Sequence, residues 1–147
     1  MKKISTLYKK DPSDLGRIIK EINQATPKLT DQYLGSVDVT YYGDNHLPIH
    51  DHPIIHNITY PAIHTETLIV VDDVICSGRT SLSVIHALNG AKKKYTKIKL
   101  AILVDRGLRE VPIQPDFTGM DIDTNVSEEI YVHVFDVDGH DSIHIGY

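Results

Sequence analysis

The chain reads Leu68-Ile-Val-Val-Asp72-Asp73-Val-Ile-Cys76-Ser77-Gly78-Arg79-Thr80-Ser81 at residues 68–81, where an apolar segment passes through a short polar loop into a helical pattern. The continuous run of apolar residues at 68–71 is typical of a strand that is covered on both faces of a parallel sheet. A helix is expected over Thr80–Leu88, and a second buried strand over Ile98–Val104. This order of strand, helix and strand indicates a βαβ unit, so we expect an α/β fold with a parallel sheet.

The rest of the chain gives weaker signals on either side of this unit. In the helix at Thr80–Leu88, the spacing favours an inward face of Leu82, Ile85 and Leu88. The other expected elements are a helix beginning at the N-cap Asp11, a strand at Ser36–Tyr42, a polar loop or arm at Gly43–His56, and strands at Ile130–Val137 and Ser142–Tyr147.

Length and composition exclude several classes of protein. With 147 residues, 41% hydrophobic and 24% charged, the chain is expected to form one globular domain, residues 1–147. The one cysteine, Cys76, excludes a disulfide framework. The sequence has no apolar run long enough to span a membrane and no signal-peptide pattern at its start, so a cytoplasmic protein is expected.

The net charge of -5 argues against a nonspecific nucleic-acid binder, which usually carries a surplus of basic residues. Local basic groups remain candidates for RNA contact, and they are Lys92, Lys93, Lys94, Lys97, Lys99, Arg106 and Arg109.

The loop after the first buried strand has the chemistry of a sugar-phosphate site. Unpaired N–H groups at the start of a helix bind phosphate, and Gly78 would let the backbone approach the anion closely. Ser77 and Thr80 add hydroxyl donors, while Asp72 and Asp73 can accept hydrogen bonds from sugar hydroxyls or hold a hydrated Mg²⁺. This combination favours a ribose 5-phosphate; the alternative is a capped helix preceded by two solvated acids.

This run resembles the phosphoribosyl-diphosphate (PRPP) motif of type I phosphoribosyltransferases. Leu100–Ile113, with Asp116–Gly119 and Ser127–Glu129, is similar to the PyrR type, bacterial uracil phosphoribosyltransferases that also regulate pyrimidine operons by binding mRNA. The segment Gly35–Asp44 resembles the strand that leads into the flexible arm of that family. The resemblance implies a parallel-sheet fold with helices on both faces and a homo-oligomer.

The resemblance also implies roles for individual residues. Asp72, Asp73, Asp105 and Arg106 would be catalytic; the two consecutive acids would face the ribose hydroxyls and the Mg²⁺ of the PRPP complex. Asp105 and Arg106 would lie near the base and the pyrophosphate. The residues implied to bind PRPP, with its 5-phosphate at the last four, are Val74, Ile75, Cys76, Ser77, Gly78, Arg79 and Thr80.

Two departures from the family pattern bear on function. Gly43 stands where the family usually has an arginine, and four histidines crowd the same arm at positions 46, 50, 52 and 56. The second departure concerns Thr26–Leu34, the interval between the first helix and the strand after it. Because this interval contains no strand with a glycine-rich turn, we expect the fold to be shortened at its N-terminal side by about one βα unit.

Three functions follow as alternatives. The first is an enzyme that converts uracil and PRPP to UMP and pyrophosphate. The second is a catalytically weak or inactive regulator that senses nucleotides and binds RNA through Arg106, Arg109 or the lysines. The third is an oligomerisation partner without a ligand.

Overall fold

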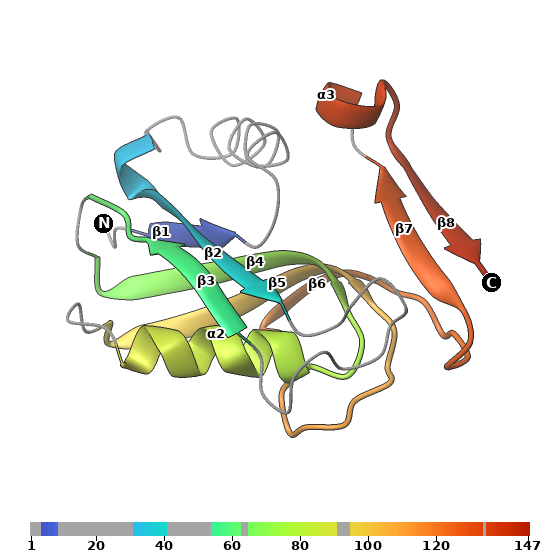
Figure 1. The fold of residues 1–147 in the computed structure, drawn as a ribbon, viewed down its shortest axis with the longest axis horizontal. Coiled ribbons are helices and arrows are strands. Elements are labelled where there is room, and N and C mark those ends of the chain that lie inside the picture. Colours follow the sequence, from blue (N-terminus) through green and yellow to red (C-terminus); the bar gives the residue numbers. More distant parts are fainter. Residues whose placement is uncertain (1–3, 9–30, 41–53, 63–64, 91–94, 134) are drawn as a thin grey trace.

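The computed structural model describes residues 4–8, 31–40, 54–62, 65–90, 95–133 and 135–147, and its centre is a six-stranded sheet (Figure 1). The strands follow the order β3-β2-β1-β4-β5-β6 across the sheet, and all neighbours are parallel except β2 and β3. Their bounds are β1 Ile4–Tyr8, β2 Leu34–Thr40, β3 Ile54–Thr59, β4 Thr67–Ile75, β5 Lys97–Asp105 and β6 Phe117–Asp121. The predicted α/β class with a parallel sheet is confirmed.

Three helical segments and a hairpin complete the described part of the chain. They are the 3-10 helix η1 (Asp31–Tyr33), the helices α2 (Arg79–Asn89) and α3 (Phe135–Asp138), and the strands β7 (Glu129–His133) and β8 (Ser142–Gly146). β7 and β8 pair with each other in a separate two-stranded sheet, to one side of the main sheet (Figure 1). No helix in the described ranges is long and apolar enough to cross a membrane.

The predicted shortening by one βα unit is not confirmed. β1 occupies the place in the sheet between β2 and β4, and it is parallel to both. Its last residue, Tyr8, pairs with Val71 of β4. The interpretation of the sequence missed this strand because Ile4–Tyr8 is short and stands between basic residues; the helix predicted from Asp11 lies outside the described residues.

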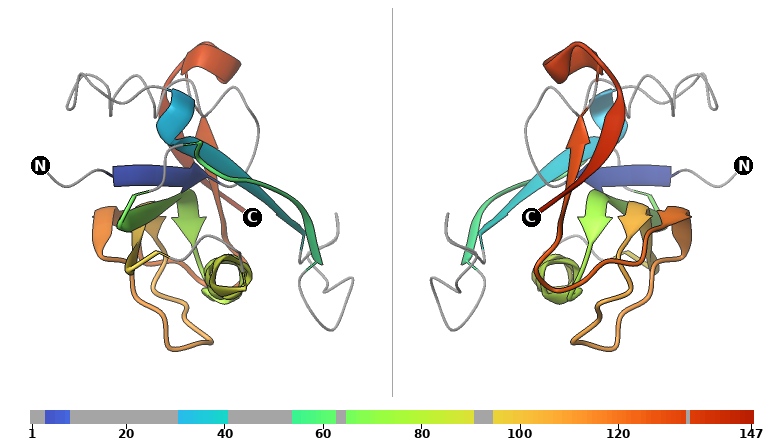
Figure 2. Two further views of the ribbon diagram at one scale, coloured as in Figure 1. Left: turned by 90° about the vertical axis from the view of Figure 1, so that its left-hand side faces the viewer. Right: turned by 90° about the vertical axis from the view of Figure 1, so that its right-hand side faces the viewer.

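The hydrophobic core forms where α2 packs on one face of the sheet (Figure 2). Alternate residues of the central strands are buried, because successive side chains of a strand point to opposite faces of the sheet. The buried cluster contains Val37, Val39, Leu68, Val70, Ile75, Val84, Leu88, Leu100 and Ile102.

The inward face predicted for α2 was right at Leu88, which is buried, and wrong at Leu82. Leu82 is 45% exposed, and the buried residues of the helix are Ser81, Val84 and Leu88. These three follow the spacing i, i+3 and i+7, which places them on one helical face. The prediction went wrong because it used apolar residues alone, whereas the small polar Ser81 occupies the first buried position.

Three further boundaries differ from the prediction. β3 begins at Ile54, inside the segment expected to be a loop, and residues 43–53 lie outside the described part. β6 was not predicted, and all of its residues are exposed, so the sequence carries no apolar alternation there. The strand predicted over Ile130–Val137 ends at His133, and the chain then forms α3.

Candidate active site

The two consecutive acids lie inside β4 rather than after it. Asp72 shares the buried face of the strand with Leu68 and Val70, and it is 5% exposed. Its Oδ1 accepts a hydrogen bond from the Asp73 N–H at 3.2 Å, and Asp73 Oδ1 accepts one from the Val74 N–H at 2.8 Å. Because consecutive strand residues turn to opposite faces, Asp73 is the more accessible of the two carboxylates.

The loop between β4 and α2 is compact and fixed by backbone contacts. Gly78 has a φ of 81° and is the N-cap of α2. A Cβ at this position would lie 2.4 Å from Ile113 Cγ2, so both the conformation and the space require glycine. Ser77 Oγ accepts a hydrogen bond from the Arg79 N–H at 3.4 Å, and the Ser77 carbonyl accepts one from the Glu110 N–H at 3.0 Å.

The start of α2 meets the physical requirements for binding an anion. The helix has no side-chain cap and no acidic residue in its first turn. The N–H groups of a first turn have no acceptor within the helix and carry partial positive charge. The hydroxyl of Thr80 stands in this turn, directly after Arg79, whose Nε donates to Glu110 Oε2 at 2.6 Å.

Asp105 and Arg109 form a nearly buried ion pair beneath this loop. Arg109 Nη2 donates to Asp105 Oδ2 at 2.5 Å, and the two side chains are 17% and 6% exposed. The other Asp105 oxygen, Oδ1, accepts the Gly107 N–H at 2.8 Å. The Arg109 guanidinium also donates to the carbonyls of Cys76 at 2.9 Å and Ile113 at 3.1 Å.

Arg106 joins the end of β5 to the segment before β7. Its Nε donates to Thr124 Oγ1 at 2.8 Å, and its Nη2 donates to the carbonyls of Asn125 and Glu128. Its backbone N–H donates to the Ile75 carbonyl at 3.0 Å. Arg106 and Asp105 were expected near the base and pyrophosphate; both side chains have partners inside the protein.

The fold gathers the predicted site residues at one edge of the sheet. β4 and β5 are parallel, and Ile75 at the end of one pairs with Asp105 at the end of the other. The carboxyl ends of adjacent parallel strands form the usual ligand crevice of an open α/β sheet. The predicted PRPP residues fall into two groups. Val74 and Ile75 belong to β4, and Ile75 is 2% exposed in the core, whereas Cys76–Thr80 follow the strand.

Two features of the site were missed by sequence reasoning. One is the ion pair of Arg109 with Asp105; the spacing of four residues was a signal, but these arginines were considered as RNA contacts. The other is the contact of Gly78 with the segment at Val111–Ile113, which joins positions more than thirty residues apart and leaves no local pattern.

Comparisons with known proteins agree with this geometry. The phosphoribosyl transferase domain family matches residues 16–136. A protein of Clostridium acetobutylicum named "Bifunctional protein PyrR" is 38% identical over 129 residues, which are 87% of this chain and 69% of that protein. A protein of the same name from Limosilactobacillus fermentum is 42% identical over 113 residues, 75% of this chain and 63% of that protein.

A solved structure with the same fold is a hypoxanthine phosphoribosyltransferase from Staphylococcus aureus. It superposes with a TM-score of 0.64 at 17% sequence identity, covering 83% of this chain and 63% of that one. The matches thus span about two thirds of the length of these relatives. The chain belongs to the phosphoribosyl transferase domain family, as a type I member whose relatives include PyrR-type proteins.

Proposed function

We propose that this chain is a uracil phosphoribosyltransferase, which converts uracil and PRPP to UMP and pyrophosphate. The observation that carries the proposal is the uncapped start of α2, with Gly78 at its N-cap, next to the acids of β4. Donors for a phosphate and acceptors for sugar hydroxyls then lie on one loop and the strand before it. The choice of uracil rests on the similarity to proteins named PyrR.

In this proposal the loop Cys76–Thr80 holds the 5-phosphate of PRPP. The N–H groups of the first turn of α2 and the hydroxyls of Ser77 and Thr80 donate hydrogen bonds to its oxygens. Asp72 and Asp73 accept hydrogen bonds from the ribose hydroxyls. In the reaction, the bond from C1 of the ribose to the pyrophosphate oxygen breaks, a bond from C1 to a uracil nitrogen forms, and that nitrogen releases its proton to the solvent.

The acids have a second role in the transition state. Positive charge develops on the ribose ring as the pyrophosphate departs, and fixed carboxylates nearby lower the energy of that charge. The hydrogen bonds from the following amides hold both carboxylates in place before the substrate arrives. Holding PRPP and uracil in line for the reaction raises the rate further.

The donor set fits a magnesium complex of PRPP. Carboxylate oxygens are ligands that Mg²⁺ prefers, and Mg²⁺ usually keeps several waters and bridges substrate phosphates. Asp72 and Asp73 would contact the ion through the PRPP complex, and the ion would neutralise charge on the departing pyrophosphate. Asp105 and Arg106 act in this proposal by positioning the segments after β5, since their side chains are held inside the protein.

The pyrophosphate end of the site has a candidate in the sequence after β1. β1 ends beside Val71, next to Asp72, so it ends at the edge of the sheet that carries the acids. Lys9 and Lys10 follow Tyr8 in the sequence, and two ammonium groups complement the charge of pyrophosphate. On the sequence alone, Lys9 and Lys10 are therefore candidates for contacts to pyrophosphate.

Calorimetric titration with PRPP and Mg²⁺, and separately with UMP, tests the proposed loop. Both ligands carry the 5-phosphate, so replacing both hydroxyls with Ser77→Ala and Thr80→Ala should weaken both by about 100-fold or more, since each lost bond to a charged group costs about 1.5–3 kcal/mol. Lys9→Ala with Lys10→Ala should weaken PRPP and leave UMP unchanged. Equal affinities in the wild type and the loop variant would refute the assignment.

A regulatory activity through RNA is a second proposal, supported by the word "bifunctional" in the names of the relatives. Two residues considered for RNA contact are already engaged within the protein. Arg109 pairs with Asp105, and Lys99 pairs with Asp116 at 2.7 Å. Lys97 remains exposed. Binding of a pyrimidine-operon leader RNA should weaken steeply with salt and in Lys97→Ala; binding that is absent or independent of salt would exclude this activity.

A further inference from the structure

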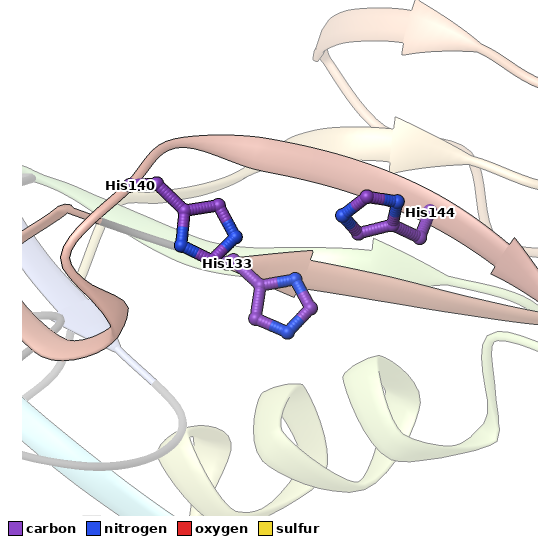
Figure 3. Close-up of side chains that lie close together, drawn as sticks. All are labelled: His133, His140 and His144. Carbon is purple, nitrogen blue, oxygen red and sulfur yellow. The ribbon is translucent and has the colours of Figure 1, made fainter.

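Three histidines lie together on the β7–β8 hairpin, and none of them belongs to the strand and loop proposed to bind PRPP. One ligand atom from each of His133, His140 and His144 lies within 4.8 Å of the others. The rings of His133 and His140 stack with their centroids 5.2 Å apart, and the rings of His133 and His144 meet edge to face at 5.3 Å. Figure 3 shows the rings of His140 and His144 approaching that of His133 across the hairpin.

The register of the hairpin explains this cluster. His133 of β7 pairs directly with Ser142 of β8, so their side chains lie on the same face of the hairpin. His144 is two residues beyond Ser142, and alternate residues of a strand share a face. His140 lies in the connection before β8, where its ring stacks on that of His133.

Hydrogen bonds prepare the imidazoles as ligands. His140 Nδ1 lies 3.0 Å from the Asp138 carbonyl, which only accepts, so this nitrogen carries the proton and leaves the Nε2 lone pair available. Such a bond from the second ring nitrogen to a carbonyl is typical of metal-binding histidines. Ser142 Oγ lies 2.9 Å from His144 Nε2 and 3.4 Å from His133 Nδ1, so both nitrogens contact one hydroxyl, which must rotate away before they can bind a metal ion.

We propose that His133, His140 and His144 form a binding site for a divalent transition-metal ion, with Zn²⁺ as the ion. Imidazole nitrogen is a ligand of choice for zinc, whereas Mg²⁺ selects oxygen. A tetrahedral site with Zn–N bonds of 2.0–2.1 Å needs nitrogens about 3.3 Å apart, so ligand atoms within 4.8 Å of one another must close by up to about 1.5 Å. The side chains of His140 and His144 can make this movement, because both are exposed. A water molecule would take the fourth position.

Bound zinc would connect the two strands of a hairpin that is separate from the main sheet. Isolated two-stranded hairpins have marginal stability in water, so a cross-link between β7 and β8 would hold this element in one conformation. The inference goes beyond the proposed transferase activity, since none of the three histidines is assigned to PRPP or uracil.

The test is a calorimetric titration of the metal-stripped, tag-free chain with zinc chloride near neutral pH. One Zn²⁺ should bind per chain, with an affinity in the micromolar range or tighter. Replacing either exposed ligand, by His140→Ala or His144→Ala, should weaken binding about tenfold or more, the range measured for ligand-supporting residues. His86→Ala is the matched control, because His86 is an exposed histidine on α2 and should not affect zinc.

Two outcomes overturn the proposal. One is the absence of zinc binding tighter than the millimolar range. The other is zinc binding that survives both His140→Ala and His144→Ala; the double variant His50→Ala with His52→Ala then shows whether the arm binds the metal instead.

Hydrogen exchange gives an independent readout that does not depend on affinity. Zinc should slow amide exchange across residues 129–146 in the wild type, because the cross-link holds both strands. The same addition should leave these amides unchanged in His144→Ala. Equal exchange with and without zinc in the wild type would contradict a site on this hairpin.

Discussion

Arg109 Nη2 donates a hydrogen bond to Asp105 Oδ2 at 2.5 Å, in an ion pair that is nearly closed to solvent. The same guanidinium holds the Cys76 carbonyl, at the start of the proposed phosphate loop. One residue thus connects the loops that follow β4 and β5. A charged group beneath the loop can fix its shape without touching the ligand.

The first prediction concerns this ion pair. Arg109→Ala should lower the free energy of unfolding by about 3–5 kcal/mol, because it leaves the Asp105 carboxylate buried without its partner. Urea denaturation followed by circular dichroism measures the change. The control is Arg79→Ala, whose pair with Glu110 is 42% and 55% exposed and should cost no more than about 1 kcal/mol. Similar small losses in both variants would contradict the anchoring role of Arg109.

The second prediction separates two reasons for glycine at position 78. Gly78 and Gly139 have φ values of 81° and 76°, so alanine should cost about 1–2 kcal/mol at either from backbone conformation alone. A Cβ at Gly78 would also overlap Ile113, whereas no atom lies within 4 Å of one at Gly139. Gly78→Ala should therefore cost a further 1–3 kcal/mol or so.

Thermal unfolding of the two glycine variants measures this difference. In addition, Gly78→Ala should raise the KM for PRPP, because any movement of the loop displaces the phosphate donors. If Gly139→Ala destabilises as much as Gly78→Ala, the close approach of Ile113 to the loop is not what holds its shape.

The third prediction concerns the acids of β4. The double variant Asp72→Asn with Asp73→Asn should lower turnover about 100-fold or more, comparable to losing a group that stabilises charge in a transition state. Its fold should persist, since an amide oxygen can still accept the hydrogen bonds from the following N–H groups. Glu66→Gln, an exposed acid before the opposite end of β4, is the control and should keep full turnover. Undiminished turnover in the double variant would refute both assigned roles.

The fourth prediction is a pH dependence at Asp116. Hydrogen bonds from Lys99 Nζ and the Leu100 N–H hold the pKa of this carboxyl below its ordinary value of 3.8. A carboxyl with a lowered pKa stabilises the fold above its unfolded value, and this stabilisation disappears as the pH falls through the folded value. The wild type should therefore lose more stability than Asp116→Asn between pH 6 and about pH 3.

Urea unfolding of both proteins across this interval provides the comparison for Asp116. The effect should be modest because the pair with Lys99 is partly exposed, and Lys99→Met should reduce it as well. Parallel curves for the wild type and Asp116→Asn would show that this carboxyl does not contribute to the acid sensitivity.

The sequence alone predicted the central part of the fold and of the site. The apolar runs before Asp72 and Asp105 indicated two adjacent parallel strands, and the structure has them as β4 and β5. Alternation and helical spacing are local signals, so they are visible in a single chain. The family followed from the same segments and is confirmed by the comparisons.

What the sequence did not reveal depends on distant contacts. β1 was missed because its five residues are recognisable as a strand only from their pairing with β2 and β4. The structural role of Arg109 depends in part on its hydrogen bond to the Cys76 carbonyl, 33 residues earlier in the chain. The histidine cluster depends on the register of β7 and β8, which sets His133 beside Ser142.

The most direct test of the proposed function is a turnover measurement. The purified chain is incubated with PRPP, Mg²⁺ and uracil, and nucleotides are separated by chromatography. The account predicts UMP in amounts that grow with time and require all three components. A folded protein that binds UMP at the loop Cys76–Thr80 and yet forms no UMP from uracil and PRPP would contradict it.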